Sequence, residues 1–352
     1  MTSQLAAVAK AMVASGKGIL AADESTGTAN KRFVPLNIAQ TEENRRKYRD
    51  LLFTMPDFGT YFSGVILYDE TIRQDGMRGK SFVQTLESAG AFPGIKLDTG
   101  VEHLALAPAE EKITSGLDGL AKRVEEYVKR GAKFAKWRAV ITIDEKTGLP
   151  TDACLRANAH ALARYGAICQ AGGLVPIIEP EVLMDGTMSH SIETSHAVHV
   201  RTLRLVFEEL ESQNIAFGEM VLKPSYVIPG QKFGSKASVN DVASRTLAVL
   251  MDTVPASVAG IAFLSGGQEN EDATAHLNEI NVLARAQNVP WPLTFSYGRA
   301  LQQPALNTWK GDDANVDAAQ KAIRHRAKMN SLAALGKWSP DLEKEKDLVL
   351  SR

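Results

Sequence analysis

A lysine at the end of an apolar segment is the most reactive feature of this sequence. Lys223 follows the apolar run 220–222 and precedes Pro224. Burial lowers the pKa of an amine, and a second ammonium group such as that of Lys136 would lower it further. A neutral amine of this kind could form a Schiff base with a carbonyl substrate. The same pattern also fits a structural lysine whose ammonium group reaches from a strand end into solvent.

An acid must move protons when such an adduct loses water, and Glu179 is the natural candidate. It lies in the largely apolar segment IIEPE, and Glu181 follows two residues later. An apolar environment and a neighbouring carboxylate both raise the pKa of a carboxyl group, which suits it to acid–base catalysis. Glu179 could also be a structural ion partner of Lys136 or Arg138, and that role does not exclude catalysis.

Other charged and polar residues share this position at the end of an apolar, β-branched or aromatic run. Side chains alternate between the two faces of a strand, so Lys136 and Arg138 point to one side, as do Glu179 and Glu181. Burying many charges without a function is costly, which makes the set more informative than any single member. The residues at the ends of the runs are Asp23, Lys96, Asp98, Lys136, Arg138, Glu179, Glu181, Lys223, Ser265 and Arg299.

The elements that must position these residues recur along the chain. Eight short runs predict strands, and segments with helical periodicity, such as 151–173, separate them. Successive strands begin about 30 to 45 residues apart, near the repeat of a barrel of βα units. The pattern predicts an α/β fold, a single (β/α)8 TIM barrel rather than an open doubly wound sheet. The predicted strands are 18–23, 62–69, 92–98, 134–141, 174–182, 219–227, 258–267 and 291–299.

The predicted barrel domain covers residues 1–337 and includes a helix at each end. Residues 3–15 have the periodicity of an amphipathic helix that ends at Gly16, and a C-terminal helix is expected to run to about Lys337. Residues 338–352 are rich in Glu, Lys and Asp, which predicts a polar and mobile tail.

Two loops have the composition of phosphate-binding sites. The seventh and eighth runs end in the sequences SGG (265–267) and SYGR (296–299). Glycines let backbone N–H groups approach an anion, and barrels commonly bind phosphate at these two loops. Arg299 would add a charged hydrogen bond, although SGG alone is more often a simple turn. A second cationic set, which could hold a second phosphate, consists of Lys31, Arg32, Lys96 and Arg138.

Composition and charge exclude several functional classes. The 352 residues are 44% hydrophobic and 23% charged, and 40 basic residues offset 41 acidic residues for a net charge of −1. No overall field would therefore attract nucleic acid or an anionic membrane. No apolar run approaches the roughly 20 residues of a membrane span, and no signal peptide is visible. Cys154 and Cys169 fit neither a metal site nor a disulfide framework, which indicates a reducing compartment and a cytoplasmic location.

The histidines do not predict a metal site. His190, His196 and His199 follow the fifth predicted strand and open a helix, and the other histidines are scattered. No pair of a histidine and a carboxylate ends a strand, so the chemistry is expected to need neither a metal ion nor another cofactor.

Eight longer motifs contain these residues and occur in order from residue 16 to residue 302. They are GKGILAADEST, TEENRRKYRDLLF, GIKLDTG, GAKFAKWRAV, VPIIEPEVLMDG, VLKPSYVIPG, FLSGGQ and LTFSYGRALQ. Together they closely resemble the class I, Schiff-base-forming fructose-1,6-bisphosphate aldolases. The resemblance implies a (β/α)8 barrel that reversibly cleaves fructose-1,6-bisphosphate to dihydroxyacetone phosphate and glyceraldehyde-3-phosphate without a metal ion, in glycolysis and gluconeogenesis.

The resemblance also implies a role for each residue of the predicted site. Lys223 would form the Schiff base, and Glu179 would be the acid and base for dehydration. Lys136 would assist carbinolamine formation, with Glu181 setting its charge state, and Asp23 would take the proton of the C4 hydroxyl. The phosphate of the dihydroxyacetone half would bind Ser265, Gly266, Gly267, Gly298 and Arg299. The far phosphate, on the glyceraldehyde half, would bind Ser25, Thr28, Arg32, Lys96 and Arg138.

Partners and competing functions follow from the same resemblance. The protein is expected to bind a sugar bisphosphate and to form a homo-oligomer, because the family is commonly tetrameric, and some members bind cytoskeletal partners. Vertebrate members end in a tyrosine that exchanges the C3 proton, whereas the last tyrosine here is Tyr297. The resemblance therefore does not identify the group that protonates the enamine. A transaldolase or decarboxylase would need one phosphate site instead of the two predicted here. A metal-dependent phosphatase or aldolase would need clustered metal ligands. A non-catalytic scaffold would not need Lys223, Glu179 and Asp23 together.

Overall fold

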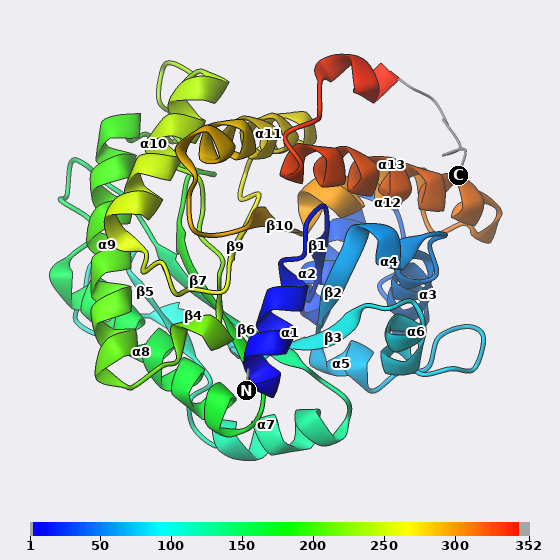
Figure 1. Ribbon diagram of the computed structural model, residues 1–352. Coiled ribbons are helices and arrows are strands. Elements are labelled where there is room, and N and C mark those ends of the chain that lie inside the picture. Colours follow the sequence, from blue (N-terminus) through cyan, green and yellow to red (C-terminus); the bar gives the residue numbers. More distant parts are fainter. Residues whose placement is uncertain (1–2, 345–352) are drawn as a thin grey trace.

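Residues 3–344 are described by the computed structural model, and their main feature is a closed parallel barrel (Figure 1). Neighbouring strands follow the order β1-β10-β9-β8-β7-β6-β3-β2, and β1 pairs with both β10 and β2 to close the ring. Helices connect the strands, so the predicted (β/α)8 barrel is confirmed. The barrel strands are β1 Gly18–Ala22, β2 Phe62–Leu67, β3 Phe92–Lys96, β6 Phe134–Ile141, β7 Val175–Val182, β8 Val221–Leu222, β9 Ile261–Phe263 and β10 Leu293–Tyr297.

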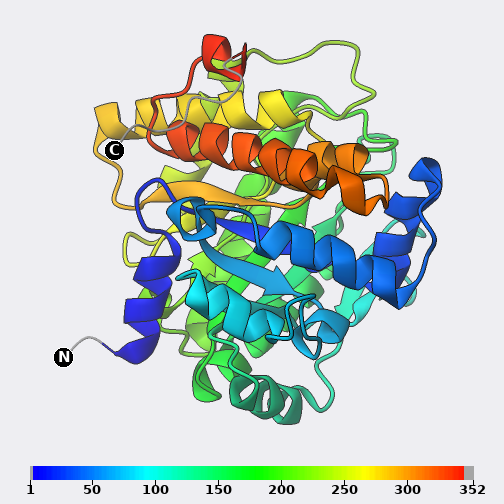
Figure 2. The same ribbon diagram turned by 90° about the vertical axis from the view of Figure 1, so that its right-hand side faces the viewer.

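Helices surround the barrel and cover the outer faces of its strands (Figure 1). Two of them lie at its ends: α1 (Gln4–Met12) packs at one end, and α2 (Thr26–Phe33) lies at the opposite end (Figure 2). The other α-helices are α3 Glu42–Phe53, α4 Phe58–Tyr61, α5 Asp69–Ile72, α6 Phe82–Ser88, α7 Leu120–Lys129, α8 Asp152–Ala171, α9 Ile192–Ser212, α10 Val239–Thr253, α11 Asn270–Gln287, α12 Arg299–Trp309 and α13 Val316–Ala334. Short 3₁₀ helices are η1 Val34–Leu36, η2 Phe217–Glu219, η3 Asp313–Asn315 and η4 Pro340–Lys344.

Side-chain caps fix where several of these helices begin. The Thr151 hydroxyl accepts a hydrogen bond from the backbone N–H of Cys154 at the start of α8, at 3.2 Å. Ser191 and Ser238 cap α9 and α10 in the same way. Each hydroxyl replaces an acceptor that the first turn of a helix lacks. The cap and the glycines after Ala171 explain why the predicted helix 151–173 and the observed α8 nearly coincide.

Apolar side chains close the N-terminal end of the barrel. Ala9 and Met12 of α1 pack with inward-facing strand residues, which include Ile19 and Phe134. The Phe134 ring fills space that a β-carbon on Gly94 would need, because that carbon would lie 2.2 Å from the ring. A glycine at position 94 therefore lets the aromatic ring fill a narrow barrel. With this end packed by apolar groups, polar side chains can gather only at the other end.

A few elements differ from the sequence predictions. An antiparallel hairpin of β4 (Gly100–His103) and β5 (Lys112–Ser115) lies outside the barrel and was not predicted. Helix α1 ends at Met12 rather than at residue 15, and α13 ends at Ala334 rather than near Lys337. Among residues 3–344, no helix combines the length and the hydropathy that crossing a membrane would require.

The predicted polar tail begins with an anchored turn. Glu343 of η4 accepts hydrogen bonds from the Trp338 indole N–H at 2.9 Å and from the Arg326 guanidinium at 2.5 Å. His325 Nε2 lies 2.9 Å from the same carboxylate. These contacts hold η4 against α13. The remainder of the predicted tail, 345–352, lies outside the described residues, so its mobility stays a prediction.

Candidate active site

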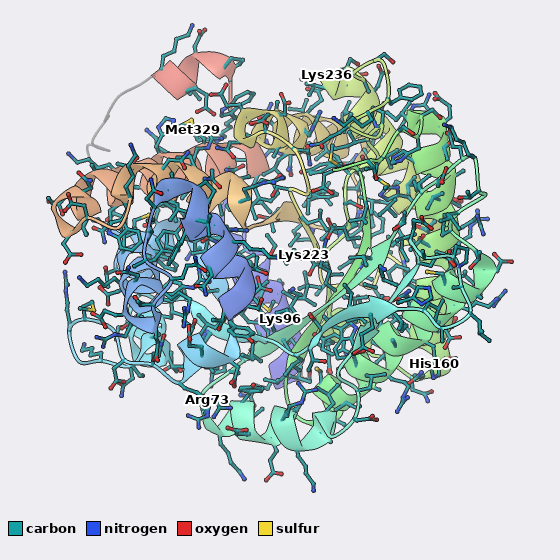
Figure 3. All side chains as sticks on the ribbon, turned by 180° about the vertical axis from the view of Figure 1, so that it is seen from behind. Arg73, Lys96, His160, Lys223, Lys236 and Met329 are labelled. Atoms are coloured by element: carbon teal, nitrogen blue, oxygen red, sulfur yellow. The ribbon has the colours of Figure 1, made fainter. Side chains whose placement is uncertain are left out.

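A cavity of about 960 Å³ opens at the C-terminal ends of the barrel strands. Figure 3 shows Lys223 and Lys96 near the centre of the ring, whereas Arg73 and His160 lie towards its periphery. Every residue predicted for the site except Gly267 lines this cavity: Asp23, Ser25, Thr28, Arg32, Lys96, Lys136, Arg138, Glu179, Glu181, Lys223, Ser265, Gly266, Gly298 and Arg299. The residues that sequence reasoning selected therefore converge in space.

Lys223, Glu179 and Lys136 form a buried cluster at the inner end of the cavity. Lys223 directly follows β8, and its Nζ lies 3.0 Å from Glu179 Oε1 on β7. Glu179 Oε2 lies 3.4 Å from Lys136 Nζ on β6. The three residues are only 3%, 4% and 4% exposed, so their charges interact with little screening by water. A carboxyl group in contact with an amine is placed to move protons to and from an adduct at that amine.

Asp23 joins this cluster from the other side of the barrel, just beyond β1. Its Oδ2 lies 2.7 Å from Lys136 Nζ. Burial alone would raise the pKa of Asp23, but the charge of Lys136, helped by Lys223 and Lys96, holds that pKa well below its usual range. Burial alone would lower the pKa of Lys136, but Asp23 and the nearby carboxylates raise it above its usual value. At neutral pH Asp23 is therefore ionised, as a base must be, and Lys136 is a cation.

Glu181 and Asp98 neutralise other cations of the cavity. Glu181 Oε2 accepts a hydrogen bond from Arg138 Nε, and Asp98 Oδ1 lies 2.5 Å from Lys96 Nζ. The resemblance linked Glu181 to the charge of Lys136, but in the structure Lys136 contacts Asp98, at 3.9 Å, and the carboxylates of Asp23 and Glu179 described above. Glu181 lies two residues further along β7 than Glu179, nearer the opening of the cavity, where Arg138 also lies.

The loops after β9 and β10 border one side of the cavity. Gly266 has φ +53°, a conformation that residues with a β-carbon rarely adopt, and its carbonyl accepts a hydrogen bond from Arg299 at 3.0 Å. Helix α12 begins at Arg299, so its first backbone N–H groups, which have no partner within the helix, lie beside this loop. Such an arrangement of N–H groups and a guanidinium suits a phosphate.

Gln231 connects this loop to the loop after β7. Its carboxamide donates a hydrogen bond to the Gly267 carbonyl at 3.0 Å and accepts one from the Gly186 N–H at 3.1 Å. Gly267 itself lies behind the cavity, where a β-carbon would be 2.3 Å from that of Asp185. Gln231 and Gly267 therefore support the loop rather than line the cavity.

The start of α2 borders the other side of the cavity. Ser25 caps this helix by accepting a hydrogen bond from the Thr28 N–H at 3.3 Å, and the two hydroxyl groups are 3.1 Å apart. Arg32, one turn further on, lies 2.5 Å from Glu24. Two hydroxyls, a helix N-terminus and a guanidinium make this a second region suited to an anion.

The histidines do not gather into a metal site. His199 is buried, and its ring nitrogens lie 2.7 Å from the Ser195 carbonyl and 3.0 Å from the Ser225 hydroxyl. Burial lowers the pKa of His199 to about 4, so the ring is neutral at pH 7. Within residues 3–344, no group of three or more His, Cys, Asp or Glu side chains is arranged to hold a metal ion. Cys154 and Cys169 are buried free thiols.

Sequence reasoning gave no role to several residues of the site. Asp98 was recognised at a strand end, but its contact with Lys136 depends on the pairing of β3 with β6. Ser296 Oγ is buried and has no hydrogen-bond partner among the described residues, although its residue lines the cavity. Its place in the SYGR motif was the only signal. Nothing in the sequence distinguished Glu24 or Gln231.

This fold and this site define a class of (β/α)8 barrel protein whose cavity surrounds a buried lysine and is bordered by two regions suited to anions. Comparison with known proteins identifies the family to which such a barrel belongs. The family described as fructose-bisphosphate aldolase class-I matches residues 4–349. A probable fructose-bisphosphate aldolase class 1 of Xanthomonas axonopodis pv. citri is 54% identical over 336 residues, which are 95% of this chain and 98% of that protein.

More distant relatives give the same result. The cytosolic fructose-bisphosphate aldolase 4 of Arabidopsis thaliana is 48% identical over 97% of this chain and 85% of its own. A solved structure of fructose-bisphosphate aldolase from Plasmodium falciparum, in complex with TRAP and a small-molecule inhibitor, superposes with a TM-score of 0.92 at 46% identity and covers 95% of both chains. The chain therefore belongs to the class I fructose-bisphosphate aldolase family and is a lyase.

Proposed function

We propose that this protein reversibly cleaves fructose-1,6-bisphosphate to dihydroxyacetone phosphate and glyceraldehyde-3-phosphate through a Schiff base on Lys223, without a metal ion. The observation that carries the proposal is the 3.0 Å contact between Lys223 Nζ and Glu179 Oε1 in the buried end of the cavity. Membership of the family supports the substrate and a role in glycolysis and gluconeogenesis.

The first half of the reaction joins the substrate to Lys223. Glu179 accepts a proton from the Lys223 ammonium, and the neutral amine attacks the C2 carbonyl of the open-chain sugar to form a carbinolamine. Glu179 then returns a proton to the carbinolamine hydroxyl, which leaves as water. The product is a protonated imine. Lys136 stabilises the developing negative charge on the carbonyl oxygen because its ammonium lies beside Glu179.

The second half breaks the bond between C3 and C4. Asp23 takes the proton of the C4 hydroxyl, C4 becomes the aldehyde of glyceraldehyde-3-phosphate, and the electron pair of the broken bond moves into the imine to give an enamine. The positive imine nitrogen makes this step feasible because it takes up the charge that would otherwise remain on C3. Protonation at C3 and hydrolysis then release dihydroxyacetone phosphate and restore Lys223.

Two phosphate sites would hold the substrate across the cluster. Ser265, Gly266, Gly298 and Arg299 would bind the phosphate of the dihydroxyacetone half, whereas Gly267, which does not line the cavity, would support their loop. Ser25, Thr28, Arg32, Lys96 and Arg138 would bind the far phosphate. This orientation sets C2 towards Lys223 and the C4 hydroxyl towards Asp23. Charged hydrogen bonds at both ends would position the reacting atoms.

Location and assembly belong to the same proposal. The Arabidopsis relative is named as cytosolic, which supports a cytoplasmic location. The family resemblance supports a homotetramer. The complex of the Plasmodium relative with TRAP supports an additional protein-binding role, with a cytoskeletal partner as one form of it.

An assay of purified protein with a chelator tests the function. Fructose-1,6-bisphosphate should be cleaved to equal amounts of the two triose phosphates in the presence of EDTA. Lys223→Arg keeps the positive charge but cannot form an imine, so this variant should lose cleavage while it still binds the substrate. Loss of activity with EDTA and its return with Zn²⁺ would overturn the proposal, as would full activity of the arginine variant.

A further inference from the structure

A buried arginine behind the cavity shares a carboxylate with Arg32. Arg49 of α3 is 4% exposed and does not line the cavity. Its guanidinium lies 2.6 Å from Glu24 Oε2. The other carboxylate oxygen, Glu24 Oε1, lies 2.5 Å from the guanidinium of Arg32, which does line the cavity. One carboxylate therefore holds two guanidinium groups, of which one faces the substrate cavity.

Glu24 is fixed in place and stays charged. Its side chain is only 7% exposed, and it accepts a hydrogen bond from Gln302 Nε2 of α12 at 2.9 Å. Gln302 also donates to the Ala21 carbonyl of β1 at 2.6 Å. Burial alone would raise the pKa of Glu24, but Arg32 and Arg49 hold it below its usual value. A buried carboxylate of this kind needs at least one cation beside it, because a buried unpaired charge is strongly unfavourable.

The two arginines are not equivalent. The Arg32 side chain is 26% exposed, whereas that of Arg49 is 4% exposed. Arg49 is also held by Gln302 Oε1 at 3.4 Å and lies against the Tyr48 ring, with its guanidinium carbon 5.9 Å from the ring centre. A phosphate in the cavity can reach Arg32 and compete with Glu24 for it, but it cannot reach Arg49.

We propose that Arg49 is a positioning residue for the far phosphate: it keeps Glu24 neutralised, so that Arg32 can leave Glu24 and bind the substrate. Without Arg49, Glu24 would have Arg32 as its one remaining cation and would hold it more tightly. Arg32 would then be less available to the phosphate. The inference rests on the proposed function and explains how one of its two phosphate sites becomes available.

Arg49→Met tests the proposal because it removes the charge and keeps most of the side-chain volume. The KM for fructose-1,6-bisphosphate should rise about tenfold or more, the usual effect of losing one charged contact to phosphate. The KM for fructose-1-phosphate, which has no far phosphate, should stay within about twofold. The double variant Arg49→Met/Glu24→Gln should return the bisphosphate KM to within about threefold of the original value, because an amide no longer holds Arg32 as an ion pair.

A matched control and a second measurement make the test independent of folding defects. Arg46→Met removes a charge from the same helix at a partly exposed position, where Arg46 pairs with Glu43, and should change neither KM. A crystal structure of the unaltered protein with inorganic phosphate should show Arg32 on the phosphate and the Arg49–Glu24 contact retained.

The outcomes separate this inference from the proposed function. Equal changes in KM for both sugars, no rescue in the double variant, or a phosphate complex in which Arg32 stays on Glu24 would overturn the role of Arg49 while the unaltered protein still cleaves both substrates. Failure of the unaltered protein to cleave either sugar would overturn the proposed function itself.

Discussion

Glu179→Gln would keep the shape of the central carboxylate but remove its charge and its transferable proton. Glu179 lies 3.0 Å from the Lys223 ammonium and 3.4 Å from that of Lys136. At an effective dielectric constant of about 20, each contact supplies about 5 kcal/mol of attraction before desolvation is counted. The two ammonium groups face different oxygens of the carboxylate, so the amide would present its oxygen to one and its N–H₂ to the other. The two lysines would then repel each other with less compensation.

The catalytic effect should exceed the effect on binding. A general acid or base contributes about 10²- to 10⁴-fold, so kcat should fall at least about 10²-fold, which corresponds to about 3 kcal/mol of transition-state stabilisation. KM should change much less, because the proposed phosphate ligands Arg299 and Arg32 remain. Imine formation should slow most, and the fraction of enzyme trapped by borohydride shortly after mixing with substrate should fall in parallel with kcat.

Glu111→Gln provides the matched control for this variant. Glu111 is 1% exposed and outside the cavity, where it accepts hydrogen bonds from the Thr151 N–H and hydroxyl at 2.6 and 2.7 Å. Loss of the Glu111 carboxylate should lower the free energy of unfolding and leave kcat nearly unchanged. If Glu179→Gln keeps kcat within about threefold of the original value, Glu179 is a structural ion partner and the mechanism proposed here is refuted.

Further predictions concern the phosphate sites, a supporting loop contact and pH. Arg299→Ala should raise the KM for both fructose-1,6-bisphosphate and fructose-1-phosphate by about tenfold or more. Lys96→Ala should raise the KM for the bisphosphate only. An equal rise in both KM values in the Lys96 variant would contradict two separate phosphate sites. Gln231→Ala should raise KM for dihydroxyacetone phosphate with kcat nearly constant, and an unchanged KM would show that the loop holds its position without this carboxamide. Burial lowers the pKa of His199 and His276 to about 4 in the folded protein, so the unfolded chain binds more protons between pH 6.5 and pH 4. The free energy of unfolding should therefore fall as pH decreases through this range, by up to about 3 kcal/mol for each histidine. Urea titrations should show a smaller fall in the His199→Gln variant. Equal free energies of unfolding at pH 7 and pH 4.5 would contradict the lowered pKa values.

Much of the fold, and the convergence of the candidate site residues in one cavity, could be predicted because both depend on local patterns. Charged residues at the ends of apolar runs indicated the end of the barrel at which the cavity opens. Lys223 and Glu179 were recognisable because each interrupts an apolar strand segment, and burial of a lone charge there has no structural benefit. The glycine-rich ends of the last two strands stood out because glycine permits the close approach of backbone N–H groups that a phosphate site would need.

The contact of Glu179 with Lys136 was one of the predicted alternatives, but other charge pairs could not be predicted because they depend on register and closure. Arg138 lies opposite Glu179 in the β6–β7 register, yet its ion partner is Glu181, two residues further along β7. Lys136 meets Asp23 only because the sheet closes and brings β1 and β6 around one cavity. Neither relation is encoded in the spacing of residues along the chain.

Elements with weak local signals were also missed. The β4–β5 hairpin is short, and Thr114 is its one buried residue, so it lacks the apolar runs that identified the barrel strands. The anchored turn η4 lies in a segment whose composition indicated disorder, but Glu343 finds a guanidinium, an imidazole and an indole on or near α13. Long-range contacts of this kind can order a segment whose composition alone predicts disorder.

Borohydride trapping would show whether Lys223 carries the proposed covalent imine. The protein would be incubated with dihydroxyacetone phosphate and EDTA, reduced with borohydride, digested and mapped by mass spectrometry. We expect one stable adduct, on the peptide that contains Lys223, and none without the substrate or in Lys223→Arg. An adduct on Lys136 or another lysine, or no adduct while cleavage continues, would contradict the proposal.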